Sequence, residues 1–180
     1  MRVPEDRASA ASFADLALPL FDQLYNFARW LTQDKTEAED LVQETYAKAL
    51  RGFSSFQPGT NFRAWIYRIL RNSFLNSRAG LKVTVVIDEE DGETLPTVGS
   101  TPESLLIEQA TREIVQQALE TLPIHFREIL LLCDVEDMSY KEIAETLSIP
   151  AGTVMSRLSR ARKALRLALS EKMQGGRRGL

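Results

Sequence analysis

The chain has 180 residues, of which 44% are hydrophobic, and its formal net charge is −3. This length allows one ordinary domain or two small ones, and this hydrophobic content argues against global disorder. The longest apolar run, Ile129–Cys133, is far shorter than the roughly 20 residues of a membrane span, so no membrane span is expected. The N-terminus lacks a basic-then-apolar signal pattern, which predicts a cytoplasmic protein. A single cysteine, Cys133, excludes an internal disulfide and any cysteine-cluster metal site.

The charge is distributed unevenly along the chain. Residues 60–82 contain five basic and no acidic residues, and residues 151–180 contain eight basic residues and one acidic residue. The remainder of the chain is therefore strongly acidic. Two separated basic segments on an otherwise acidic chain predict two contacts with a polyanion, although either segment taken alone could be an ordinary solvated helix face.

Helical periodicity dominates the first part of the chain. One helix is expected over residues 13–32. A capping box formed by Thr36 and Glu39 predicts a second helix that runs to about Leu50. Residues 52–61 are expected to form a loop with a turn at Pro58 and Gly59, and a third helix should cover residues 62–78. Together these elements predict a first helical domain at residues 12–79.

Residues 80–100 differ in composition from the segments on either side. They contain three glycines, a proline and a cluster of acidic residues, which predicts a flexible acidic linker. Beyond the linker, capping and proline signals predict four helices, over residues 101–122, 123–133, 139–147 and 153–172. These helices form a second predicted domain at residues 101–173. The expected fold class is all-α, with two small helical domains.

The last two predicted helices have the pattern of a helix-turn-helix, because a tight turn joins them and the second is rich in arginine. At about 100° per residue, an apolar stripe that includes Val154 and Leu158 lies on one side of the last helix. Short polar and basic residues lie on the other side, an arrangement that suits the major groove of DNA. An amphipathic hairpin with a solvated basic face is the alternative. The candidate DNA contacts are Thr153, Ser156, Arg157, Ser159, Arg160, Arg162 and Lys163.

Two faces in the first predicted domain are candidates for binding. In the segment AEDLVQETYAKAL, Asp40, Gln43 and Glu44 share one helix face, and an acidic face of this kind suits a basic protein partner. The following helix interleaves aromatic and basic residues, as binding to unstacked single-stranded bases requires. Trp65 and Ile69 are expected to belong to the core. The candidate nucleic-acid contacts are Phe56, Asn61, Phe62, Arg68, Asn72 and Asn76.

Taken together, these segments resemble the extracytoplasmic-function (ECF) sigma factors of bacteria, which belong to the sigma-70 family. AEDLVQETYAKAL and NFRAWIYRILRNSFLNSR resemble sigma region 2, and LPIHFREILLLCDVEDMSYKEIAETLSIPAGTVMSRLSRARKAL resembles region 4. The resemblance covers about two-thirds of the chain. It implies a sigma factor that binds core RNA polymerase, reads promoter DNA and is held inactive by an anti-sigma factor.

The resemblance also implies roles for matching residues. Asp40, Gln43 and Glu44 would bind the coiled coil of the largest polymerase subunit. The loop at residues 56–61, with Asn72, would capture a flipped base of the −10 element. The −35 element would be read by Ser156, Ser159 and Arg160, with Arg157 and Arg162 on phosphates. The family often has a basic residue where Met155 stands, so the −35 preference does not transfer. The acidic linker would thread through the polymerase cleft.

The rival functions have less support in the sequence. A sigma factor needs no cofactor or metal, and the single histidine, His125, lies outside any recognisable catalytic set. A two-domain helix-turn-helix regulator that binds only duplex DNA is the alternative, but it would not need the acid-free aromatic helix. QETYAKAL, WIYRIL and GTVMSRL resemble the branch that answers thiol-oxidative stress under a zinc-containing anti-sigma factor. With one cysteine in the chain, redox sensing would belong to that partner.

Overall fold

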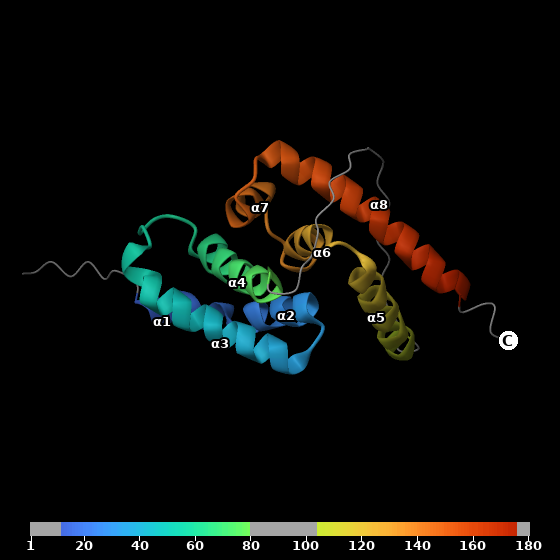
Figure 1. The fold of residues 1–180 in the computed structure, drawn as a ribbon, viewed down its shortest axis with the longest axis horizontal. Helices are drawn as coiled ribbons and strands as arrows, with labels where there is room; N and C mark the ends of the chain where they lie inside the picture. The colour runs from blue at the N-terminus through green and yellow to red at the C-terminus, as the bar shows by residue number, and fades with distance from the viewer. Residues whose placement is uncertain (1–11, 80–103, 176–180) are drawn as a thin grey trace, which may run out of the picture. The chain divides into compact units, whose positions relative to one another are not determined.

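The computed structural model describes residues 12–79 and 104–175, and the chain divides into two compact units at residues 1–81 and 82–180 (Figure 1). The first unit contains α1 (Phe13–Ala17), η1 (Leu18–Leu20), α2 (Phe21–Thr32), α3 (Lys35–Gly52), η2 (Phe53–Ser55) and α4 (Phe62–Ala79). The second contains α5 (Ser104–Thr121), α6 (Ile124–Leu130), η3 (Leu131–Val135), α7 (Tyr140–Leu147) and α8 (Ala151–Gly175). All secondary structure in the described residues is helical, which confirms the predicted fold class. The predicted acidic linker and the helix start at Thr101 and Pro102 lie outside the described residues.

The N-terminal helical segment is divided at Pro19. Ser12 caps α1, since its hydroxyl accepts from the Asp15 N–H at 3.2 Å and its own N–H donates to the Asp15 carboxylate at 3.0 Å. The 3-10 turn η1 then carries Pro19 between α1 and α2. Because proline has no backbone N–H, it interrupts the hydrogen-bond ladder of a continuous helix. The prediction of one helix over residues 13–32 is therefore wrong.

Two consecutive residues set the turn from α2 to α3. Gln33 takes a left-handed φ of 63°, which ends α2. Asp34 caps α3, and its Oδ1 accepts from the Glu37 N–H at 2.8 Å. The predicted capping box at Thr36 and Glu39 is therefore wrong, and the cap lies two residues earlier in the chain.

The core of the first unit lies between α2, α3 and α4. Tyr67 of α4 is fully buried, and its ring centroid lies 5.2 Å from that of Phe27 in α2. Trp65 and Ile69 are only half-buried, so the prediction that they belong to the core is wrong. The buried side of α4 instead comprises Phe62, Ala64, Ile66, Tyr67, Leu70, Ser73 and Phe74. Consequently α4 presents Trp65 at the edge of the unit.

The helix predicted over residues 123–133 begins as expected, but its last turn is not α-helical. Pro123 precedes α6, and the chain widens into the π-helical turn η3 at its end. The predicted capping box at the start of α7 is confirmed. The Ser139 hydroxyl accepts from the Glu142 N–H at 3.3 Å, and the Glu142 carboxylate accepts from the Ser139 N–H at 2.9 Å.

α8 begins two residues earlier than predicted and is the longest described helix, with 25 residues. The left-handed Ser148, with φ 55°, ends α7, and the chain enters α8 after Pro150. The inner faces of the two helices are buried as expected, through Val154, Leu158 and Ala161 of α8 and Ile143 and Leu147 of α7. These contacts fix which side of α8 remains outward. Within the described residues, we find no helix long and apolar enough to cross a bilayer.

Candidate nucleic-acid and protein-binding surfaces

The outer face of α3 presents the predicted docking residues. Asp40, Gln43 and Glu44 are all exposed, while Leu41, Val42, Thr45 and Ala49 on the opposite side are buried. Glu44 forms an ion pair with Lys48 one turn further along the helix. Lys48 also donates to the Ser73 hydroxyl of α4 at 2.9 Å, so it ties α3 to α4. The three predicted residues therefore form one polar strip on a rigidly held helix.

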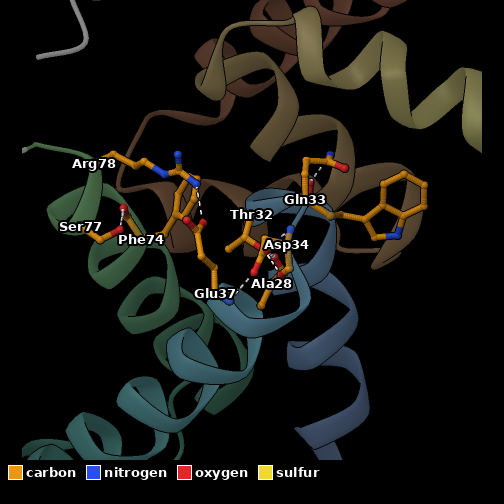
Figure 2. Close-up of polar contacts among 9 residues, drawn as sticks. Ala28, Thr32, Gln33, Asp34, Glu37, Phe74, Ser77 and Arg78 are labelled. Carbon is orange, nitrogen blue, oxygen red and sulfur yellow. Dashed lines mark hydrogen bonds and ion pairs between the residues drawn. The ribbon is translucent and has the colours of Figure 1, made fainter. Parts of the chain in front are cut away.

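An ion pair between α3 and α4 fixes one end of this strip (Figure 2). The Arg78 Nη2 atom lies 2.7 Å from Glu37 Oε2, and the N–H of Glu37 is itself held by the Asp34 cap. At the start of this corner, the hydroxyl of Thr32, the last residue of α2, donates to the carbonyl of Asp34 at 2.9 Å. These contacts, which join the last turns of α2 and α4 to the first turn of α3, set the position of the strip.

A hollow lies beside the strip, between α3 and α4. It is lined by Thr32, Glu37, Asp40, Leu41, Glu44, Phe74, Ser77 and Arg78. Leu41 and Phe74 are buried and supply an apolar floor, while Asp40 and Glu44 are exposed and supply acid at the rim. Such a surface fits a partner side chain with an aliphatic stem and a positive head, which is the chemistry of lysine and arginine.

The loop before α4 is held by a cluster of aromatic rings. Phe56 contacts Phe53, Phe62 and Trp65, with ring centroids 5.9, 5.2 and 5.2 Å away, respectively. Phe62 is only 8% exposed, so in this conformation it supports Phe56 and Trp65 and offers little of its own surface to DNA. The Pro58–Gly59 turn is confirmed: Gly59 takes φ 85°, and the Thr60 N–H donates to the Gln57 carbonyl at 3.2 Å. Phe56 and Trp65 are half-buried and form the accessible edge of the cluster.

One side of α4 continues from this aromatic edge. Asn61, Trp65, Arg68, Asn72 and Asn76 follow one another at separations of three or four residues, so they lie on a single face. Asn72 and Asn76 are exposed, and Arg68 is half-buried. Asn61 has a structural role, because its Oδ1 accepts from the Ala64 N–H at 3.0 Å and caps α4. The face is therefore aromatic at its start and amide-rich at its end.

The outward face of α8 carries only part of the predicted −35 set. Lys163 and Met155 are exposed, and Thr153, Ser156 and Ser159 are half-buried. The Arg160 guanidinium folds back along the helix, with Nη2 3.4 Å from the Ser156 hydroxyl. Arg160 also lies near His125 of α6. The pKa of His125 is lowered, first by burial and then by the charges of Arg157 and Arg160.

The two arginines predicted to flank the reading face both form ion pairs within the second unit. Arg157 Nη1 lies 3.9 Å from Oε1 of Glu128, a carboxylate that is only 1% exposed in α6. Arg162 Nη2 lies 2.7 Å from Asp134 Oδ1 in η3. Sequence reasoning missed both pairs, because neither acid is close to α8 along the chain. The apolar surroundings of Glu128 in the segment REILLL gave the one available signal that its carboxylate needs a buried partner.

The geometry is that of a nucleic-acid-binding protein. The first unit has the polar strip on α3 and a face of α4 that carries aromatic and amide side chains, and the second unit has a helix-turn-helix. The chain matches the family models of sigma-70 region 2 over residues 19–82 and of sigma-70 region 4 over residues 112–165. It belongs to the ECF RNA polymerase sigma factors of the sigma-70 family. The alternative of a regulator that binds only duplex DNA is not favoured by this membership.

Relatives and solved structures agree with this assignment. The chain is 36% identical over 162 residues to ECF RNA polymerase sigma factor SigE of Mycolicibacterium smegmatis, covering 89% of this chain but only 63% of that relative. It is 30% identical over 168 residues to ECF RNA polymerase sigma factor SigW of Bacillus subtilis, covering 89% of this chain and 90% of SigW. The sigma factor RpoE of Bartonella quintana, solved in complex with the anti-sigma factor NepR, superposes with a TM-score of 0.63 at 30% identity, covering 85% of this chain and 93% of RpoE. Sigma factors are not enzymes. Membership of the thiol-oxidative-stress branch stays a prediction.

Proposed function

We propose that the chain acts in the cytoplasm, where it binds core RNA polymerase through Asp40, Gln43 and Glu44 and directs it to promoters. The units at residues 12–79 and 101–173 serve as sigma regions 2 and 4, joined by the acidic linker. The observation that carries this proposal is the α4 face, where an accessible aromatic edge leads into exposed amides. Unstacked bases need flat apolar partners, and base edges need groups that both donate and accept.

A pull-down with core RNA polymerase followed by promoter-directed transcription tests the whole proposal. The chain should be retained by core polymerase and should direct initiation at specific start sites. A chain that binds duplex DNA but neither binds polymerase nor supports initiation would instead be a regulator.

We further propose that an anti-sigma factor holds the chain inactive. The support is structural likeness, because RpoE of Bartonella quintana was solved with its anti-sigma factor NepR and is 30% identical to this chain. An anti-sigma factor should compete with core polymerase for the chain. The test is to purify the chain from its host under non-inducing conditions and to identify the protein bound to it. Excess core polymerase should displace that protein from the chain.

The −10 assignment predicts a conditional effect of Asn72→Ala. The mutant should lose about three- to tenfold of its transcription from a closed duplex promoter, the range expected for one lost hydrogen bond. It should lose much less on a template whose −10 region is already open and altered in sequence. Asn26→Ala, at another exposed asparagine in the first unit, is the matched control and should behave like the parent chain. Equal activity of the Asn72 mutant and the parent on the duplex promoter would contradict the assignment.

The −35 assignment predicts different effects for two cations of α8. An arginine that forms a bidentate hydrogen bond with guanine contributes roughly 1–3 kcal/mol of discrimination against other bases. Arg160→Ala should therefore reduce the base preference at one position of the −35 element. Lys163, which is exposed, should contact phosphate, and Lys163→Ala should weaken binding to all −35 sequences by the same factor. Affinities for a panel of single-base −35 variants decide the matter. A uniform loss in Arg160→Ala with altered preference in Lys163→Ala would mean that α8 lies in the groove with a different rotation.

A further inference from the structure

The guanidinium of Arg162 is already held within the second unit. Its Nη2 lies 2.7 Å from Asp134 Oδ1 and 3.6 Å from Cys133 Sγ, both in η3. Pairing with Asp134 raises the pKa of Arg162, and burial of the Cys133 thiol raises the pKa of that thiol. The side chains of Arg162 and Asp134 retain 36% and 46% of their exposure, so both reach solvent.

This pair lies at the edge of the outward face of α8. Arg162 follows Ser159 by three residues, which places it about 60° from Ser159 around the helix. It directly precedes the exposed Lys163. Arg162 is also close enough to Tyr140, the first residue of α7, for the two side chains to interact electrostatically. If α8 enters the major groove as the proposed −35 contact requires, a DNA backbone running along this flank would meet the Asp134 carboxylate.

We propose that Asp134 competes with the DNA backbone for Arg162 and thereby weakens the binding of the second unit to duplex DNA. This inference rests on the proposed −35 contact of α8. A carboxylate at this edge repels phosphate, and it pairs with an arginine that could otherwise reach phosphate. An exposed ion pair contributes little stability, so opening it costs little once a phosphate is available.

The consequence is a lower affinity that is independent of base sequence. Because phosphate contacts supply essentially all non-specific binding, weakening one of them lowers the affinity of the chain for DNA of arbitrary sequence. Asp134 would therefore limit the time that the free chain spends on arbitrary DNA. In the polymerase-bound state, where the DNA is presented to α8 by other contacts, Arg162 can exchange Asp134 for phosphate.

The experiment measures binding of the full chain to a fluorescent duplex of arbitrary sequence over a series of salt concentrations. Asp134→Asn should bind about three- to tenfold more tightly at low salt, and its slope of log affinity against log salt should steepen by about one. Asp137→Asn is the matched control, because it removes the same charge three residues further on. Asp137 has φ 50°, a left-handed conformation that asparagine tolerates well. The control should show a smaller gain and no change in slope.

The double mutant separates competition from general repulsion. In an Arg162→Ala background, Asp134→Asn should no longer steepen the slope, because the cation that it releases is gone. A steepening that survives there would overturn the proposal, as would unchanged or weaker DNA binding of Asp134→Asn. Thermal melting of Asp134→Asn should match that of the parent. A large fall would mean that the pair positions α8, and this too overturns the proposal.

Lys163→Ala in the same assay distinguishes failure of this inference from failure of the −35 contact itself. If Lys163→Ala weakens duplex binding while Asp134→Asn changes nothing, only the competition is wrong. If Lys163→Ala also changes nothing, α8 does not lie on DNA, and both proposals are wrong.

Discussion

Replacing Asp40, Gln43 and Glu44 together by alanine is expected to lower affinity for core RNA polymerase by about 100-fold, which corresponds to about 2.7 kcal/mol. The three side chains are exposed on one face of α3 and would be desolvated together in the complex. Hot-spot side chains of this kind typically cost 2 kcal/mol or more when truncated. Alanine is the best helix former, so the fold of α3 should persist. The one intramolecular pair lost, between Glu44 and Lys48, is an exposed i,i+4 pair worth only about 0.3–0.5 kcal/mol.

Glu39→Ala is the matched control for this triple mutant. Glu39 lies on the same helix and has an i,i+4 lysine partner, Lys35, at 3.9 Å. It lies about 100° from Asp40 around the helix and one turn before Gln43, so it borders the strip without belonging to it. Fluorescence anisotropy of the labelled chain with core polymerase measures affinity, and melting followed by tryptophan fluorescence reports on the first unit, which contains both Trp30 and Trp65. If the triple mutant binds like the Glu39 control, the docking face lies elsewhere.

The faces of α3 and α8 could be predicted from the sequence because both follow from helical periodicity alone. Buried positions such as Leu41 in α3 and Leu158 in α8 recur at one-turn spacing, and this leaves the polar positions outward. The start of α3 could not be predicted in the same way. Asp34 and Thr36 are both good capping residues within three positions of one another. Which of the two caps α3 depends on the left-handed backbone conformation of Gln33, and the sequence does not predict that conformation.

The ion pairs could not be predicted because their members are distant in sequence. Glu37 and Arg78 are 41 residues apart, and Asp134 and Arg162 are 28 residues apart. Periodicity identifies which face a residue occupies but not which side chain of another helix meets it. Periodicity alone therefore predicts DNA contacts for four basic residues of α8: Arg157, Arg160, Arg162 and Lys163. Two of them, Arg157 and Arg162, form intramolecular pairs in the folded unit.

Whether an arginine of α8 contacts DNA or forms an intramolecular ion pair matters most at Arg157. Arg157→Ala is expected to destabilise the second unit by about 2–3 kcal/mol. Glu128 is 1% exposed, and the Arg157 side chain, 22% exposed, supplies a positive charge 3.9 Å from its carboxylate. Removing one partner of a buried pair leaves an uncompensated charge and typically costs 3–5 kcal/mol. The expected cost is lower here, since Arg157 reaches solvent and Glu128 has further interactions.

Denaturant unfolding followed by two signals should locate this loss in the second unit. Far-UV circular dichroism reports on both units, whereas tryptophan fluorescence reports on the first. For Arg157→Ala, part of the dichroism change should move to lower denaturant while the fluorescence transition stays in place. Adding Glu128→Gln should restore part of the stability, because a neutral amide is less costly to bury than a carboxylate. Lys163→Ala, which removes an exposed charge from the same helix, should leave both transitions unchanged. If Arg157→Ala also leaves both unchanged and only weakens DNA binding, Arg157 contacts phosphate as the sequence first indicated, and its pairing with Glu128 contributes little to the fold.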